Sequence, residues 1–241
     1  MIPIFTTHYS IGKSILTLDE PCDSNEGATS VFALAQKANL NKIVLVENSM
    51  TGFPQAFSTA KKLKKDLVFG LKIKVEEQGH KVIVFAKNSN GCKDLNKVYS
   101  ECNSTEDNIS ISKLKEIWSN DLIMSIPFYD SFLYKNTMSF DTCTPNLKFF
   151  KPTFFLEYNE LPFDQLIRKK VIDYCESNDF VTEECKSIKY ELKDDVEAFQ
   201  TYQCICSRKF GQKSLSNPGL DHFGSNSFSI ESFLDNEAQP F

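Results

Sequence analysis

Short apolar runs alternate with amphipathic stretches along this chain, and no other feature of the sequence constrains its fold more. Residues 43–46 (Ile-Val-Leu-Val) are apolar throughout, as in a buried strand, and they follow a helical pattern of apolar residues over 31–38. A second helical pattern over 53–63 is followed by a β-rich run over 67–75. Repeated units of this kind favour a parallel sheet or a barrel with helices outside. We therefore predict an α/β fold.

The same alternation continues toward the C-terminus, without an internal repeat at the periods of solenoid proteins. We expect one continuous domain over residues 1–226 and a C-terminal tail over 227–241 that docks through Phe228, Ile230 and Phe233. Loops rich in turn residues are expected over 19–28 and 211–226. Further strands are predicted over 80–86, 122–126 and 153–156, with the end of another over 187–192, and further helices over 92–99, 111–118, 161–175 and 194–206.

Size and charge narrow the classes of function. A chain of 241 residues can bury about 70% of its unfolded surface, so a real hydrophobic core is available. The formal net charge of -5 would repel phosphate backbones, and direct DNA binding is therefore expected to be weak or absent. The densest basic run is interpreted as the solvated end of a helix rather than a phosphate contact, and it comprises Lys61, Lys62, Lys64 and Lys65.

The cysteines do not follow a metal-binding pattern. None of the eight belongs to a CxxC pair, and only three histidines are present to complete a zinc site. Residues 1–14 lack the apolar core of a signal peptide, and no later run reaches about 18 apolar residues. We expect a cytoplasmic protein with reduced thiols, without a membrane segment and without a cofactor. The cysteines are Cys22, Cys92, Cys102, Cys143, Cys175, Cys185, Cys204 and Cys206.

The stretches HKVIVFAKNSNG over 80–91 and LVENSMTGF over 45–53, together with several shorter ones in the correct order, resemble the PHP domain that opens the alpha subunit of bacterial replicative DNA polymerase III. The most specific is HKVIVFAKNSNG over 80–91, which is similar to the family's HLxLLAKNxxG. The stretch LVENSMTGF over 45–53 stands where the family has a TDHGNM-like motif at a strand end. The other matching stretches are 9–10, 67–72, 153–157, 187–190 with 204–205, and 223–228. The resemblance implies a distorted (β/α)7 barrel, in which His, Asp, Glu and Cys at the strand ends hold up to three metals and hydrolyse phosphoesters.

The positions that match the family's metal ligands depart from it systematically. Closely spaced divalent metals need carboxylates and neutral imidazoles, and by this comparison only His80 is an identical ligand, with Glu47 as a nonideal oxygen donor. The matching positions are Ile4, Thr6, Lys13, Glu47, Asn48, Lys72, His80, Pro127, Ser187 and Lys189. Lysines at three of them would repel a divalent ion. We expect these amines either to pair with Glu47 in a structural ion network or to bind an anion such as phosphate.

Several conspicuous residues have a plainer interpretation. His80 without partner ligands is expected to be a hydrogen-bonded residue at a strand end, while His8 and His222 show no partner pattern. Cys204 and Cys206 are interpreted as packing residues of a helix. The phenylalanines at 149, 150, 154 and 155 are expected to fill the core rather than to stack on bases. The terminal residues 238–241 are faintly similar to a clamp-binding peptide but lack its aliphatic positions.

The leading hypothesis is a catalytically inactive PHP-like domain, stand-alone or split from a polymerase, that acts as a scaffold or accessory in DNA replication. The sequence stops before any palm region, so we expect no polymerase activity from it. The resemblance implies a DNA polymerase polypeptide, a proofreading exonuclease or a sliding clamp as the partner. Two alternatives stay open: a PHP-type metal-dependent phosphoesterase with a rebuilt site, and a structural or assembly protein that uses the same fold. The high Lys, Asn and Phe content is typical of an AT-rich cellular or phage genome.

Overall fold

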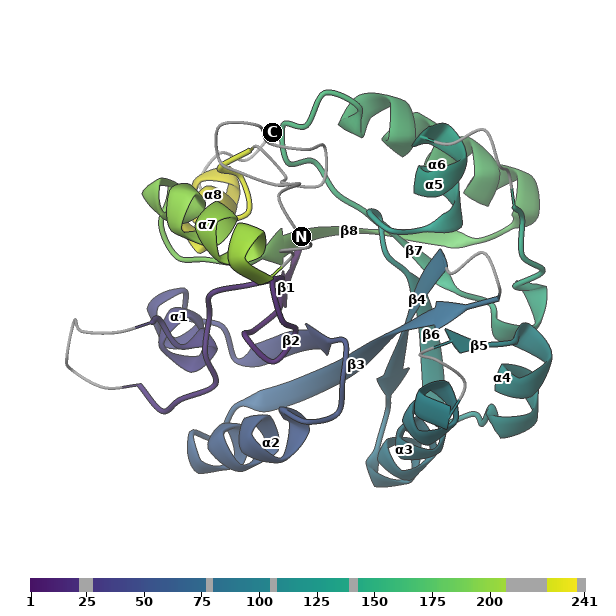
Figure 1. Ribbon diagram of the computed structural model, residues 1–241, viewed down its shortest axis with the longest axis horizontal. Coiled ribbons are helices and arrows are strands. Elements are labelled where there is room, and N and C mark those ends of the chain that lie inside the picture. Colours follow the sequence, from purple (N-terminus) through teal and green to yellow (C-terminus); the bar gives the residue numbers. More distant parts are fainter. Residues whose placement is uncertain (22–27, 77–79, 105–107, 139–142, 207–224, 238–241) are drawn as a thin grey trace.

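Seven strands of the computed structural model close into a ring, with helices around it (Figure 1). The structure describes residues 1–21, 28–76, 80–104, 108–138, 143–206 and 225–237. The strands follow the order β2-β1-β8-β7-β6-β4-β3, and pairing of β3 with β2 closes the barrel. The predicted seven-stranded α/β barrel is therefore confirmed. Its strands are β1 (Ile2–Phe5), β2 (Lys42–Glu47), β3 (Asp66–Val75), β4 (His80–Ala86), β6 (Leu122–Ile126), β7 (Thr153–Leu156) and β8 (Val181–Ile188), and β5 (Asn108–Ile109) adds to the far end of β3.

Strand β4 runs against both of its neighbours, whereas the other six barrel strands are parallel. Only residues 76–79 separate β3 from β4, and a parallel connection needs a crossover of about a dozen residues or more. The two strands must therefore form an antiparallel pair, which the sequence pattern had not indicated. As a result the first residues of β4 lie at the same end of the barrel as the last residues of the parallel strands.

Eight helices are described, and local capping explains several of their boundaries. Ser30 and Ser110 cap α1 and α4 through their hydroxyl oxygens, and Asn88 accepts from the backbone N–H of Asn90 and Gly91 at the start of α3. Helix α3 is therefore longer than the predicted 92–99. The helices are α1 (Val31–Lys37), α2 (Phe53–Lys62), α3 (Ser89–Ser104), α4 (Ile111–Ile117), α5 (Phe132–Met138), α6 (Asp164–Asn178), α7 (Val196–Cys206) and α8 (Ile230–Glu237), and α5 and α8 were not predicted.

Two predicted boundaries in the last third were wrong. The strand whose end was placed at 187–192 is β8, which covers Val181–Ile188 and so ends four residues earlier, and a short 3-10 helix over Lys193–Asp195 precedes α7. The first half of β8 is largely solvent-exposed and polar, so it carries no apolar run. Phe233 of α8 and Phe228, two residues before the helix begins, are both buried and pack against the rest of the chain. Cys22, His222, residues 211–224 of the expected late loop and residues 238–241 lie outside the described residues.

A small apolar cluster fills the barrel, separate from the larger core between strands and helices. Its buried members are Ile4, Val46, Ile83, Phe85, Phe155 and Cys185. Gly70 makes room for it, because a Cβ at that position would lie 2.5 Å from Cε1 of Phe85. Phe155 points into the barrel as expected, whereas Phe154 points outward and packs against Phe132 and Phe180. Phe149 is 57% exposed and does not belong to the core.

The described residues give two further observations on composition. All seven cysteines within them are free. No helix within the described ranges is both long and apolar enough to cross a membrane.

Candidate functional site

The alternation of side chains along each strand selects the residues that face the barrel mouth. Ile4, Val46 and Phe155 point into the barrel, and the residues two positions later, each the first after the end of its strand, continue the alternation and point inward as well. These are Thr6, Asn48 and Glu157, and they line a cavity of about 60 Å³ at the carboxyl ends of the parallel strands. Binding residues of parallel barrels gather at this end.

Most of the positions singled out from the sequence meet in this cavity. Eight of the ten line it: Ile4, Thr6, Lys13, Asn48, Lys72, Pro127, Ser187 and Lys189. Glu47 and His80 are not among the lining residues. The rest of the lining was not anticipated from the sequence and consists of Val46, Lys81, Ile83, Tyr129, Asp130, Phe155 and Glu157.

Glu47 lies on the opposite face of β2 from its neighbour Asn48. One carboxylate oxygen accepts from the backbone N–H of Thr7 at 2.9 Å and from its hydroxyl at 2.6 Å, and the other accepts from the hydroxyl of Ser10. Burial raises the pKa of Glu47 to about 7, although these hydrogen bonds oppose the shift. Glu47 thus fixes the loop that follows β1, and this loop carries Lys13 to the cavity.

His80 also points away from the cavity, which corrects both interpretations of this residue. On the reversed strand β4, Ile83 and Phe85 face inward, so Lys81 faces inward and His80 outward. Its ring packs edge-on against Phe132, with centroids 6.0 Å apart, and its two nitrogens have no hydrogen-bond partner among the described residues. Burial lowers the pKa of His80 to about 4. His80 is therefore a packed core residue rather than a metal ligand or a hydrogen-bonded strand end.

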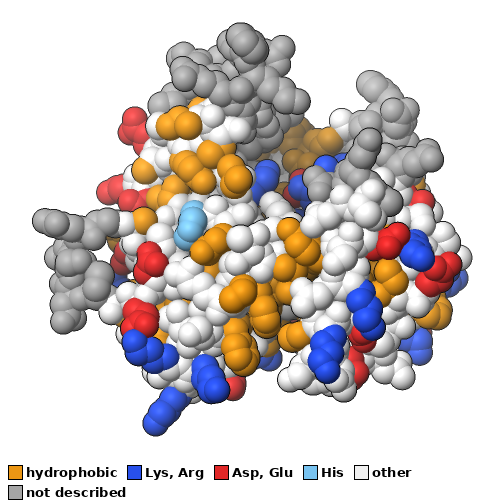
Figure 2. Space-filling model, turned by 60° about the horizontal axis from the view of Figure 1, so that its bottom comes forward, with side chains coloured by type: hydrophobic (Ala, Val, Ile, Leu, Met, Phe, Trp, Pro, Cys, Tyr) orange, Lys and Arg blue, Asp and Glu red, His pale blue; other side chains and the backbone are white. Residues whose placement is uncertain are grey.

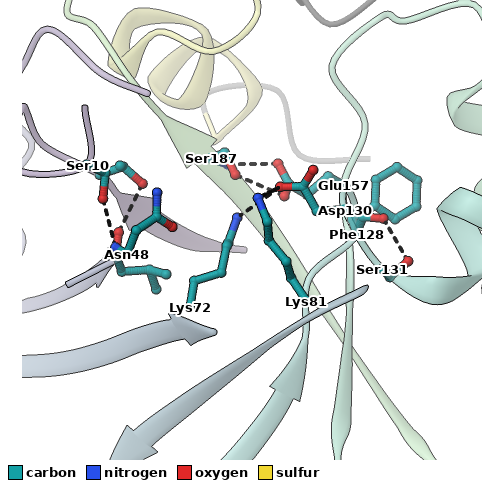
Figure 3. A network of polar contacts seen from close by, with 11 residues as sticks. Ser10, Asn48, Lys72, Lys81, Phe128, Asp130, Ser131, Glu157 and Ser187 are labelled. Atoms are coloured by element: carbon teal, nitrogen blue, oxygen red, sulfur yellow. Dashed lines mark hydrogen bonds and ion pairs between the residues drawn. The ribbon is translucent and has the colours of Figure 1, made fainter. Parts of the chain in front are cut away.

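Asp130 forms ion pairs with two lysines at the mouth of the barrel (Figure 3). Its Oδ2 lies 3.2 Å from Nζ of Lys81 and 3.8 Å from Nζ of Lys72. Its carbonyl oxygen also accepts from the backbone N–H of Lys81 at 3.1 Å. Burial opposes ionisation of this carboxyl, but Lys72, Lys81 and Lys13 together hold its pKa well below the usual range. The expected pairing of the lysines with Glu47 is wrong for Lys72, because Asp130 is its carboxylate partner.

The second carboxylate of the cavity, Glu157, is held by neutral donors. The hydroxyl of Ser187 donates to one oxygen at 2.9 Å, and the backbone N–H of Ser187 donates to the other at 2.9 Å (Figure 3). The side-chain amide of Asn159 donates to the latter oxygen at 3.0 Å. Glu157 therefore ties the end of β7 to the end of β8.

Lys189 is the most deeply buried cation of the cavity. It is 9% exposed, and its Nζ lies 4.3 Å from the ring centre of Phe228 and 5.4 Å from that of Phe199. Burial lowers the pKa of Lys189 to about 7, with Glu157 and Asp130 opposing the shift and Lys72 and Lys13 adding to it. Burial likewise lowers the pKa of Lys72.

The side chains of the cavity do not fit a metal cluster. Among the described residues no three His, Cys, Asp or Glu side chains are placed to hold a metal ion. The described lining offers the carboxylates of Asp130 and Glu157 against four ammonium groups, those of Lys13, Lys72, Lys81 and Lys189. Figure 2 shows basic and acidic side chains lying together in a hollow of one face of the molecule. Ammonium groups cannot ligate a cation and they repel it.

The lining residues that we did not predict differ in whether a sequence pattern indicates them. Lys81 and Glu157 stand two positions from Ile83 and Phe155, so the period of two along their strands could have identified them. Asp130 comes from the loop between β6 and α5, where no periodic signal exists. His8 does not line the cavity, and its ring lies 4.5 Å from that of Tyr9.

Comparison with known proteins adds a structural likeness alone. No protein-family model and no curated protein matches the chain. Among solved structures, the chain is similar to a protein from Bifidobacterium adolescentis that is provisionally described as a metal-dependent phosphoesterase. The TM-score is 0.45 at 8% sequence identity, over 77% of this chain and 87% of the other. A likeness at this level carries no functional conclusion, and the barrel assignment rests on the strand pairing itself.

Proposed function

We propose that this chain is a PHP-like barrel without metal-dependent hydrolytic activity that acts as a scaffold or accessory in DNA replication. The observation that supports the loss of hydrolysis is the set of side chains at the barrel mouth. Four lysines and two carboxylates line it, whereas metal-dependent phosphoester hydrolysis requires several carboxylates and imidazoles around each ion.

Electrostatics favours the same conclusion. Two unit charges 4 Å apart interact by about 4 kcal/mol at an effective dielectric constant of 20, and the effect doubles for a divalent ion. The ion pairs of Lys72 and Lys81 with Asp130 place two ammonium groups on the carboxylate that a metal would need. A cation entering the cavity would have to displace both.

The proposed role in replication rests on the order of the stretches that resemble the polymerase domain. A polymerase polypeptide, a proofreading exonuclease and a sliding clamp are the partners that this resemblance suggests. The net charge of -5 supports contact with such proteins rather than with DNA directly.

Two measurements test the proposal. The purified protein is expected to contain no stoichiometric Mn, Zn or Fe and to release no phosphate from model phosphoesters. Stoichiometric metal with turnover that is lost in Asp130→Ala and Glu157→Ala, but kept in His80→Leu, would overturn the loss of hydrolysis. For the partner, affinity purification of the tagged chain from its own cells is expected to recover replication proteins. Recovery of capsid or tail proteins instead would favour the structural alternative.

A further inference from the structure

We propose that the barrel mouth binds a phosphate-class dianion directly through lysine side chains, in the place where a hydrolytic barrel would hold metals. This inference rests on the metal-free character of the cavity proposed above and is independent of the role in replication. The ligand is a tetrahedral oxyanion, either free in solution or as the terminal phosphate of a monoester.

The charges around the cavity are not balanced. Four ammonium groups face two carboxylates, so the described lining has a formal surplus of two positive charges, which a dianion would neutralise. Asp130 is shared between Lys72 and Lys81, at 3.8 and 3.2 Å, so one negative charge serves two positive ones. Glu157 is engaged by Ser187 and Asn159, which are neutral donors.

The ammonium groups of the cavity are poorly solvated. The side chains of Lys72 and Lys81 are 25% and 20% exposed, and Lys189 is more deeply buried still. Burying a cation is costly unless an anion accompanies it. An oxyanion among these ammonium groups would offset that cost and would form charge-assisted hydrogen bonds, which are about twice as strong as neutral ones.

The cationic groups come from separate elements that the fold holds in place. Lys72 extends from β3, Lys81 from the start of β4 and Lys189 from the residue after β8. Lys13 lies in the loop after β1, where its backbone N–H donates to Ser10 at 2.9 Å, and Glu47 binds the hydroxyl of the same serine. The site is thus built on the barrel, and not on flexible surface lysines.

The size of the cavity selects the ligand. Its volume of about 60 Å³ suits a group as small as phosphate or sulfate, and its floor is apolar, formed by Ile4, Val46, Ile83 and Phe155. Only the charged end of a larger molecule could enter, with the remainder outside the mouth. Thr6, Asn48 and Ser187 supply neutral polar groups beside the lysines.

The test is isothermal titration of the full-length, metal-free protein with sodium sulfate, inorganic phosphate and glycerol phosphate at pH 6.5, against sodium chloride of equal ionic strength. Sulfate and phosphate are expected to bind one to one, and chloride to give no saturable signal. Lys72→Met is expected to weaken sulfate binding at least tenfold. Lys61→Met removes one charge from an exposed surface position and is expected to change it less than twofold.

Each outcome decides a point. No saturable binding, or equal binding by Lys72→Met and Lys61→Met, would overturn the site. If Lys72→Met does not fold, as judged by circular dichroism, Lys13→Met at the rim takes its place with the same expected loss. Binding of glycerol phosphate as tight as that of phosphate would identify a monoester terminus as the ligand, and its failure would identify the free ion. Anion binding that disappears with EDTA would instead show a metal and contradict the proposed loss of hydrolysis.

Discussion

Lys72 and Asp130 lie 3.8 Å apart (Nζ to Oδ2) across the barrel mouth, and Lys81 approaches the same oxygen at 3.2 Å (Figure 3). A strand, the reversed strand beside it and the loop after β6 are thereby joined by one carboxylate. Asp130 is the negative charge that offsets the repulsion between these ammonium groups, so it stabilises the fold. It also competes with an added anion for the same two lysines.

Replacing Asp130 with Asn should therefore have two opposite effects. We expect the free energy of unfolding to fall by about 1–2 kcal/mol without added anion, since two lysines lose their counter-charge at a partly exposed position. Sulfate should stabilise the variant more than the wild type. Urea unfolding with and without sulfate checks this. Asp94→Asn, which breaks an exposed pair with Lys97, is the matched control and should cost no more than about 0.5 kcal/mol. Equal sulfate effects in the wild type and Asp130→Asn would contradict the prediction.

A substitution at Gly70 tests the packing of the barrel interior. An alanine there would place its Cβ 2.5 Å from the ring of Phe85, closer than packing allows. We expect Gly70→Ala to lower the free energy of unfolding by about 1–3 kcal/mol, which is typical of overpacking. The double variant Gly70→Ala/Phe85→Leu should recover part of that loss, as measured by urea unfolding of all four forms. Purely additive effects would show that the ring of Phe85 is not the obstacle.

Glu47 should make stability depend on pH in the neutral range. Its pKa is raised by burial from 4.5 to about 7, so the stability it contributes is full below pH 4.5 and is lost as the pH rises through 7. Glu47→Gln cannot ionise, and between pH 5 and 8.5 we expect it to gain up to about 3 kcal/mol relative to the wild type. Denaturant unfolding at both pH values measures the difference.

Glu47→Ala is the contrasting variant. It leaves the buried backbone N–H of Thr7 unpaired and should cost about 2 kcal/mol at pH 5. Because alanine cannot ionise either, this deficit against the wild type should shrink toward pH 8.5, as the gain of Glu47→Gln grows. Glu47→Ala should also weaken sulfate binding, because the loop that carries Lys13 loses its anchor at Ser10. If the gain of Glu47→Gln did not grow with pH, this would show that burial does not raise the pKa of the Glu47 carboxyl.

His80 should control stability on the acid side. Its pKa is lowered by burial, with Lys135 adding to the shift and Glu76 opposing it, to about 4 from 6.5. The stability linked to the neutral ring is full above pH 6.5 and is lost as the pH falls toward 4, by up to about 3 kcal/mol. His80→Leu keeps the packing on Phe132 without a charge to bury, and its unfolding free energy should fall less between pH 7 and 4 than that of the wild type. The same acid slope in both proteins would refute this.

The barrel could be predicted from the sequence because five of its strands, β2, β3, β4, β6 and β7, are marked by apolar or alternating runs between helical patterns. The reversal of β4 could not, since it follows from the short link over 76–79 and not from any side chain. Strand β8 was misplaced because its first residues are polar and exposed.

The sequence predicted those residues of the candidate site that lie at or near the ends of strands. Resemblance identified positions, but the face of the strand decides whether a side chain enters the cavity, and Glu47 and His80 are each one residue out of phase with it. Asn48 and Lys81, their neighbours in sequence, face the cavity instead. Asp130 lies in a loop with a left-handed backbone (φ 68°), where position depends on tertiary contacts that a sequence pattern does not record.

Lys189 should make anion binding depend on pH. Because the pKa of this buried amine is lowered to about 7, it is mostly protonated at pH 6 and mostly neutral at pH 8, in a cavity that it shares with Lys13, Lys72, Asp130 and Glu157. Sulfate stays dianionic over this range, so a change in its affinity reports on the protein. We expect sulfate to bind about tenfold more weakly at pH 8 than at pH 6, which corresponds to about 1.4 kcal/mol. Lys189→Met should bind weakly at both pH values, whereas Lys189→Arg should bind at both, because arginine stays charged. Titrations at the two pH values decide the point, and a wild-type affinity that does not change between them would show that Lys189 does not reach the anion.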